Sequence, residues 1–234
     1  MDAYVHTTEY YKGYAIIIQN DTDPSNPREW DNLGTMLCFH RRYNLGDDQK
    51  QVEADIEAAT RTRLPASLAD EYLPSYFTNS ENFTGWGDMA DQLEKALDLA
   101  AILPLYLYDH SGITISTGSF RDPWDSGQVG FIFISKDKAR EEYGWKRINR
   151  ARRAQLEARL TAEVEEYDQY LTGDVWGYHI HQPDPADLEE VDTDDLDPDE
   201  VENWDEKDSC WGFYGSEYCL TEARSTVDYY VKEG

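Results

Sequence analysis

The sequence predicts an α+β fold, with a largely antiparallel sheet packed against helices and a long acidic loop inserted in a C-terminal hairpin. Two observations lead to this class. Three apolar runs of strand length, Leu105–Tyr108, Ile113–Thr117 and Val129–Ile134, are separated only by the turn-rich stretches DHSG and DPWDSG. Segments with apolar residues at helical spacing flank such groups and do not alternate strictly with single strands, which is typical of α+β proteins.

The first half of the chain contains two further predicted strands and two predicted helices. The apolar run in Tyr14–Gln19 predicts a buried strand, and Thr35–His40 predicts a second. Helical periodicity appears over Gln49–Arg63, and Ser67–Leu73 adds a further turn after Pro65. A second helix is predicted over Gly87–Leu103, with this apolar stripe: Met89, Leu93, Ala96, Leu97 and Ala100.

The second half begins with a long helical region, Lys136–Tyr170, interrupted near Gly144. Val175–Gln182 and Cys210–Gly215 have similar sequences, VWGYHIHQ and CWGFYG, which favours their pairing as a hairpin. A C-terminal helix is predicted over Glu217–Lys232. The acidic segment 183–208 would be the loop of the hairpin formed by Val175–Gln182 and Cys210–Gly215. Its few apolar residues are expected to lie outside the core: Leu188, Val191, Leu196, Val201 and Trp204.

The length and composition indicate one domain spanning residues 1–234, with 183–208 as a loop or insertion within it. Hydrophobic residues make up 40% of the chain, which is enough for a core. The sequence has no apolar run near 18 residues and no N-terminal signal pattern, so we expect a soluble cytoplasmic protein without membrane association. The three cysteines, Cys38, Cys210 and Cys219, contain no CxxC pair and do not suit a disulfide framework.

The net charge is the most unusual property of the sequence. Its value of −27 comes from 48 acidic and 21 basic residues. Such a chain attracts basic surfaces and repels nucleic acid. Segment 183–208 has one lysine and 14 acidic residues, which form the candidate binding surface: Asp184, Asp187, Glu189, Glu190, Asp192, Asp194, Asp195, Asp197, Asp199, Glu200, Glu202, Asp205, Glu206 and Asp208. A solvated loop or adaptation to high salt would give the same composition.

Two stretches carry a resemblance to known proteins. DHSGITISTGSFRDPWDSGQVGFIFISK (Asp109–Lys136) and EVEEYDQYLTGDVWGY (Glu163–Tyr178) resemble a family of uncharacterised proteins of bacteriophages and other mobile elements. The similarity extends over roughly Trp30 to Tyr230, and the acidic segment is not part of the family motif. The resemblance implies an accessory protein that acts in a host cell on host machinery or on a rival's defence system. It implies no activity, cofactor or catalytic residue.

An enzymatic interpretation depends on the loops DHSG and DPWDSG. A hydrolase needs a nucleophile held by a base that a third group orients. An acid, a possible base and hydroxyls are available if the second loop folds over the first: Asp109, His110, Ser111, Asp122, Asp125 and Ser126. The simpler explanation is that these residues form turns, because no GxSxG-type nucleophile elbow is present.

Two patterns raise the question of a metal, although we expect no cofactor. His179 and His181 share one face of a predicted strand, with His40 or Cys38 as possible third ligands. Five residues match positions of a calcium loop: Asp195, Asp197, Asp199, Asn203 and Glu206. Glu200 stands where that loop requires glycine and Glu202 where it is normally apolar, so chance matches in an acidic segment explain the pattern equally well.

The chain has one basic patch, within 136–159, where nine basic and four acidic residues give a local net charge of +5. It would contact nucleic acid or neutralise the acidic segment. The strongly anionic chain argues against direct nucleic-acid binding. The sequence therefore favours a non-enzymatic acidic protein that mimics nucleic-acid charge and binds the basic surface of a host defence or regulatory protein. The alternatives are a hydrolase or metal-dependent enzyme, and a structural or assembly protein that uses its 17 tyrosines at an interface.

Overall fold

The computed structural model describes residues 4–73, 83–184, 186, 188, 192–193, 196–201 and 203–233. The chain divides into two compact units, where the length predicted one domain. Unit 1 is Met1–Asn26 with Gln169–Gly234, and unit 2 is Pro27–Asp168. Each unit has an antiparallel sheet and an apolar core of its own. The predicted α+β class is therefore confirmed, but the structure has two sheets where the sequence predicted one.

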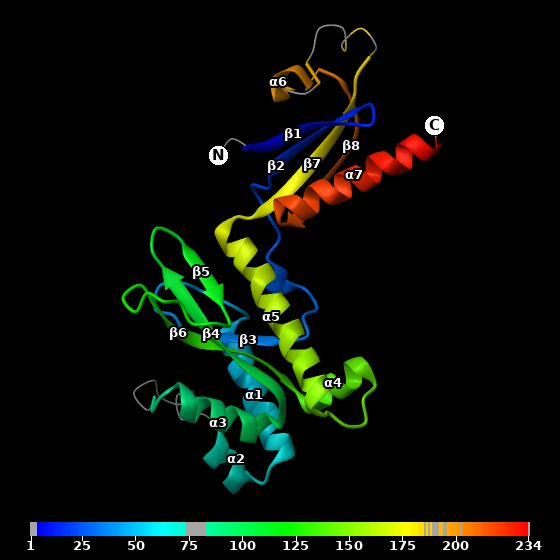
Figure 1. Ribbon diagram of the computed structural model, residues 1–234. Coiled ribbons are helices and arrows are strands. Elements are labelled where there is room, and N and C mark those ends of the chain that lie inside the picture. Colours follow the sequence, from blue (N-terminus) through cyan, green and yellow to red (C-terminus); the bar gives the residue numbers. More distant parts are fainter. Residues whose placement is uncertain are drawn as a thin grey trace. The chain divides into compact units, whose positions relative to one another are not determined.

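The described part of unit 1 contains a four-stranded antiparallel sheet, one long helix and the short helix α6 (Pro198–Val201) (Figure 1). The strand order is β1-β2-β7-β8, and the elements are β1 (Val5–Tyr11), β2 (Tyr14–Asn20), β7 (Val175–Gln182), β8 (Asp205–Tyr214) and the helix α7 (Ser216–Glu233). Cys219, Ala223 and Val227 of α7 pack on Ile16 and Ile18, which covers one face of the sheet. The predicted hairpin is confirmed, because β7 and β8 are antiparallel neighbours.

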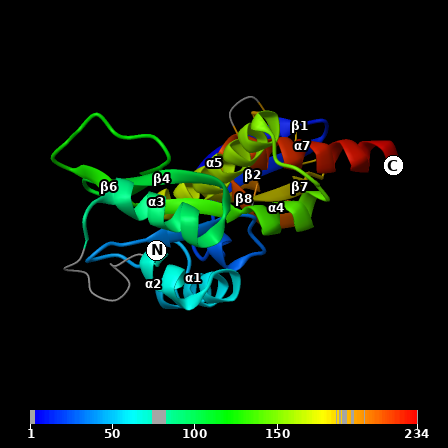
Figure 2. The ribbon, with the colours of Figure 1, turned by 90° about the horizontal axis from the view of Figure 1, so that it is seen from below.

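Unit 2 contains the second sheet, in the order β3-β6-β4-β5 (Figure 1). Figure 2 shows its strands β4 and β6 from below. The strands are β3 (Thr35–Cys38), β4 (Leu99–Asp109), β5 (Ile113–Ser116) and β6 (Ser126–Ser135). The helical elements are η1 (Pro27–Glu29), α1 (Gln49–Arg63), α2 (Ala66–Tyr72), α3 (Trp86–Leu97), α4 (Lys136–Tyr143) and α5 (Arg150–Thr172). None of the described helices combines the length and apolar character that a membrane span requires.

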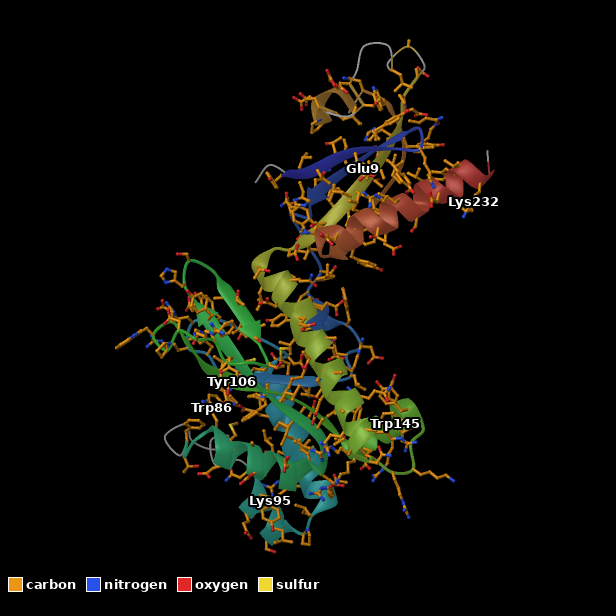
Figure 3. All side chains as sticks on the ribbon, in the orientation of Figure 1. Glu9, Trp86, Lys95, Tyr106, Trp145 and Lys232 are labelled. Atoms are coloured by element: carbon orange, nitrogen blue, oxygen red, sulfur yellow. The ribbon has the colours of Figure 1, made fainter. Side chains whose placement is uncertain are left out.

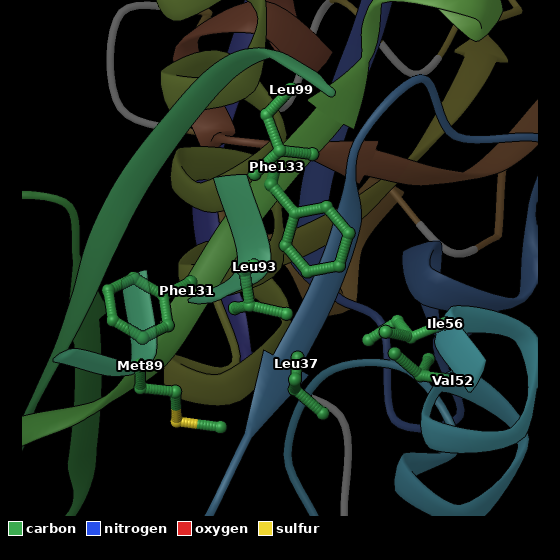
Figure 4. Packing of buried hydrophobic residues seen from close by; sticks show 8 residues of the cluster. All are labelled: Leu37, Val52, Ile56, Met89, Leu93, Leu99, Phe131 and Phe133. Carbon is green, nitrogen blue, oxygen red and sulfur yellow. The ribbon is translucent and has the colours of Figure 1, made fainter. Parts of the chain in front are cut away.

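Both faces of the second sheet are covered. On one face Phe131 and Phe133 of β6 pack with Leu37, Val52, Ile56, Met89, Leu93 and Leu99, so that α1 and α3 close the core (Figure 4). On the other face the intervening Ile132 faces Gly34 and Leu160 of α5, since a Cβ added to Gly34 would lie 2.5 Å from Leu160 and 2.9 Å from Ile132. Leu160 belongs to the stripe of α5 that is buried, with Leu156, Val164 and Tyr167.

A buried charge network fixes η1 and β3 to α5. Arg28 donates two hydrogen bonds to the carboxylate of Asp47, at 2.8 and 3.1 Å, and lies 3.4 Å from Glu163 Oε2. Glu163 also accepts hydrogen bonds from the backbone N–H groups of Leu33, at 2.9 Å, and Gly34, at 3.0 Å. Arg28 and Glu163 are only 8% and 2% exposed. Both buried charges therefore form hydrogen bonds in addition to their mutual contact, as buried charges require.

Two features of the fold differ from the prediction. The helix expected over Gly87–Leu103 ends at Leu97, because Asp98 adopts a left-handed conformation (φ 51°) and Leu99–Ala101 join the sheet as buried residues of β4. The alanines of this stretch are equally compatible with a helix and with a strand that is closely packed in a sheet. The edge strand β1 was not predicted, because its sequence VHTTEYY is polar and only half-buried.

Candidate acidic interaction surface

The acidic segment is attached to the sheet of unit 1, contrary to the expectation that its apolar residues lie outside the core. Leu188 is exposed as expected, and Val191 lies outside the described residues. Leu196, Val201 and Trp204 are 9%, 0% and 7% exposed and pack on Ala15 and Ile17 of β2. Val201 belongs to the short helix α6 (Pro198–Val201). The cause lies in β2, where Ile16 and Ile18 face α7, and Ala15 and Ile17 on the opposite face need another cover.

The loop is also shorter than predicted, because Asp205–Asp208 belong to β8 and pair with β7. Seven of the eight described acidic residues of the segment nevertheless face solvent. Asp208 is half-buried, whereas the exposed residues are Asp184, Asp192, Asp197, Asp199, Glu200, Asp205 and Glu206. The remaining predicted surface residues lie outside the described part of the chain: Asp187, Glu189, Glu190, Asp194, Asp195 and Glu202. Anchored apolar residues and exposed carboxylates thus alternate along this segment.

The charge of the chain is divided unequally between the two units. Unit 1 has 23 acidic and 4 basic residues, a net charge of −19, whereas unit 2 has 25 acidic and 17 basic residues, a net charge of −8. Unit 1 is the smaller of the two, so its charge density is much higher. The acidic residues are divided almost equally, but those of unit 2 are largely balanced by basic residues and those of unit 1 are not, so the excess negative charge is concentrated on unit 1.

The paired histidines share one face of β7, as predicted. Both lie on the face of the sheet that the acidic segment covers, since His179 pairs with Ile17 and His181 with Ala15. His181 is 6% exposed, with Nδ1 3.4 Å from the carbonyl oxygen of Trp204. His179 Nδ1 lies 3.0 Å from Glu206 Oε1, and this contact lowers the pKa of the Glu206 carboxyl.

The other predicted metal ligands occupy different environments. Burial raises the pKa of the Cys38 thiol to about 12. His40 Nδ1 accepts hydrogen bonds from the backbone N–H groups of Arg42 and Tyr43, at 3.3 and 3.2 Å. Burial, and secondarily the charge of Arg42, lowers the pKa of His40. Among the described residues, no three histidine, cysteine, aspartate or glutamate side chains converge as metal ligands would.

The described residues of the calcium pattern form local hydrogen bonds. Asp197 Oδ1 accepts a hydrogen bond from the backbone N–H of Asp199, at 3.0 Å, and so begins the helical turn of α6. Asn203 donates to the carbonyl oxygen of Asp199, and Glu206 lies on β8 beside His179. Asp195, the first residue of the pattern, lies outside the described residues.

The loops DHSG and DPWDSG do come together at the end of β4. His110 Nδ1 lies 2.8 Å from Asp125 Oδ2, and the backbone N–H of Asp109 donates to the carbonyl oxygen of Asp125 at 2.8 Å. The side chains of His110 and Asp125 are 63% and 38% exposed, however. Asp109 forms an ion pair with Arg42 and accepts a hydrogen bond from the Tyr43 hydroxyl.

The remaining polar groups of these loops stabilise turns. Asp122 Oδ1 accepts hydrogen bonds from the backbone N–H groups of Trp124 and Asp125, an Asx turn. The Ser126 hydroxyl donates to the carbonyl oxygen of Asp122. Ser111 occupies a left-handed turn position, with a φ of 59°. The loops therefore form a solvent-exposed histidine–aspartate pair, and the Ser126 hydroxyl is used in the turn.

Two cavities of unit 2 contain none of these predicted residues. An apolar one of about 170 Å³ is lined by Phe39, Phe83, Trp86 and Met89. A polar one of about 280 Å³ has mixed charge and is lined by Asp31, Asn32, Leu33, Lys138, Glu142, Tyr143 and Arg159. Both are smaller than the roughly 300–1,000 Å³ of typical small-molecule sites.

Comparison with known proteins adds no relative: no family model, curated protein or solved structure matches this chain. The resemblance of Asp109–Lys136 and Glu163–Tyr178 to proteins of phages and mobile elements stays a prediction.

Proposed function

We propose that the protein is an acidic, non-enzymatic binding protein of a phage or mobile element, and that its acidic segment engages the basic surface of a host protein as a mimic of nucleic-acid charge. One observation carries the proposal. Leu196, Val201 and Trp204 attach the segment to β2, while Asp197, Asp199 and Glu200 between them are exposed.

The attachment matters because it reduces the cost of binding. A free acidic loop loses conformational entropy when a partner orders it, whereas a segment already packed on a sheet loses less. Its exposed carboxylates also lie on a segment that is packed on the sheet, so they can present negative charge as the phosphates of a nucleic acid do. The net charge of −19 on unit 1 would steer a basic partner toward this surface and speed its association at low salt.

The enzymatic alternative is less well supported. General base catalysis favours a pair held in a site that excludes water, and the His110–Asp125 pair is largely open to solvent. No observation specifically favours an assembly role for the tyrosines. A host nucleic-acid-binding protein remains the partner that the charge pattern fits best.

The proposal is tested by neutralising three exposed carboxylates of the segment, in the variant Asp199→Asn, Glu200→Gln, Asp205→Asn. Partners are first captured from a cell lysate at low salt, identified and purified, and their affinities are then measured by biolayer interferometry. Exposed charge pairs contribute about 0.2–1 kcal/mol each, so we expect roughly 3- to 160-fold weaker binding.

A matched control removes the same charge from exposed positions of unit 2, in the variant Asp91→Asn, Glu94→Gln, Glu165→Gln. We expect this control to bind the partner with nearly the affinity of the wild type. Equal losses for the two variants would mean that only total charge matters, and the proposed surface would be wrong.

A further inference from the structure

The turn between α4 and α5 in unit 2 presents a cationic patch that the proposed function does not use. Segment 145–153, WKRINRARR, contains five basic residues and no acidic residue. Lys146, Arg147, Arg150 and Arg153 are exposed, and none of them forms an ion pair with a residue in the described part of the chain. Two other cations nearby do have carboxylate partners, since Arg140 pairs with Asp137 and Arg159 lies 3.5 Å from Glu163.

The backbone of the patch is held in place by an aromatic stack. Trp145, labelled in Figure 3, stacks on Tyr143 with ring centroids 4.4 Å apart. The Arg152 guanidinium lies 5.0 Å from the Trp145 ring, and it also donates a hydrogen bond to the carbonyl oxygen of Arg147. Trp145 and Arg152 thus join the turn to the first turn of α5, and the four exposed cations project from an ordered support.

The position of these arginines is unfavourable for the helix itself. Arg150, Arg152 and Arg153 lie within the first four residues of α5, and its first turn contains no acidic residue. Cations near a helix N-terminus oppose the helix dipole, at a cost of about 0.3–1 kcal/mol each when exposed. Helix stability therefore does not explain why arginine occurs there, and a role in contacting an anion does.

We propose that this patch, Lys146, Arg147, Arg150 and Arg153, binds the phosphate backbone of a nucleic acid without reading its sequence. Duplex DNA carries one negative charge per about 1.7 Å of its axis. Four cations within eight residues match a ligand of such density. Trp145 is already stacked on Tyr143 and Arg152, so phosphates and not bases are the expected contacts.

The total charge of the chain does not exclude this binding. At 0.1 M salt a charge is screened beyond about 10 Å, so a phosphate on the patch experiences mainly its local surroundings. The proposal does not depend on the acidic surface, because its four cations all belong to unit 2 and the acidic segment supplies none of them. It differs from the expectation from composition that the protein avoids nucleic acid.

The test uses the full chain and a fluorescent 20-base-pair duplex of arbitrary sequence, with binding followed by anisotropy. Four phosphate contacts predict a slope of about −3.6 for log affinity against log salt, which is roughly a 150-fold loss between 50 and 200 mM. The variant Lys146→Gln, Arg150→Gln, Arg153→Gln should weaken binding at 50 mM salt by about 100-fold or more and reduce the slope to about −1. Its helix content should be unchanged, because glutamine is a good helix former.

A matched variant, Arg41→Gln, Lys50→Gln, Arg121→Gln, removes the same charge from other exposed positions of unit 2 and should retain at least half of the wild-type affinity. Poly-glutamate of similar charge serves as a second probe and should bind far more weakly than the duplex. Absence of duplex binding at 50 mM salt, equal losses for the two variants, or equally tight binding of poly-glutamate would each overturn the proposal.

Discussion

Glu163→Ala is expected to lower the free energy of unfolding by about 3–5 kcal/mol, since removing one member of a buried ion pair leaves the other charge unpaired. Arg28 would retain Asp47, but the backbone N–H groups of Leu33 and Gly34 would both lose their acceptor. The measurement is chemical denaturation followed by circular dichroism, with the unfolding of unit 2 as the transition of interest.

Glu165→Ala, two residues further along α5, is the control because Glu165 is exposed. Its effect should stay within about 0.5 kcal/mol of the wild type, as is usual for surface substitutions. A loss below about 1 kcal/mol for Glu163→Ala would contradict the account of Glu163 as the acceptor that fixes η1 and β3 to α5.

Trp204→Ala is expected to cost about 3–5 kcal/mol in unit 1, the usual range for truncating a buried tryptophan. Trp204 is 7% exposed and covers Ala15 and Ile17, and its carbonyl oxygen faces His181. The substitution should also release the acidic segment, so that limited proteolysis within 183–204 becomes faster. Denaturation and a proteolysis time course measure the two effects.

Trp124→Ala is the matched control, because Trp124 is 92% exposed in the DPWDSG loop. It should leave both the stability and the proteolysis pattern unchanged. If Trp204→Ala behaved like this control, the acidic segment would be a solvated loop, and its described carboxylates would have no fixed arrangement to offer a partner.

Much of the fold could be predicted from local patterns. The strand groups around Ile113–Thr117, the break of the long helix at Gly144 and the pairing of β7 with β8 follow from periodicity, glycine and sequence similarity between the two strands. The division into two units could not be predicted, because strand pairing between distant segments leaves no local signal. The end of α3 at Leu97 depends on tertiary pairing of Leu99–Ala101 with β6.

The attachment of the acidic segment to β2 could have been predicted from the sequence, but the acidic composition of the segment concealed it. The run Ala15–Ile18 is apolar on both faces of its strand, whereas a strand with one exposed face would alternate. A second cover was therefore required, and Leu196, Val201 and Trp204 provide it. The sequence allowed DPWDSG to fold over DHSG, and His110 does lie close to Asp125, but the exposure of this pair depends on the surrounding structure.

The most direct test of the central claim is competition between duplex DNA and the protein for a captured basic partner. The competition is run with the variant Lys146→Gln, Arg150→Gln, Arg153→Gln, so that DNA binding by the patch in unit 2 does not interfere. If the acidic segment mimics nucleic-acid charge, increasing concentrations of duplex should displace the protein completely from its partner. The same variant carrying Trp204→Ala should be displaced from the partner at a lower DNA concentration. A partner that binds DNA and the protein simultaneously, without mutual displacement, would contradict the claim.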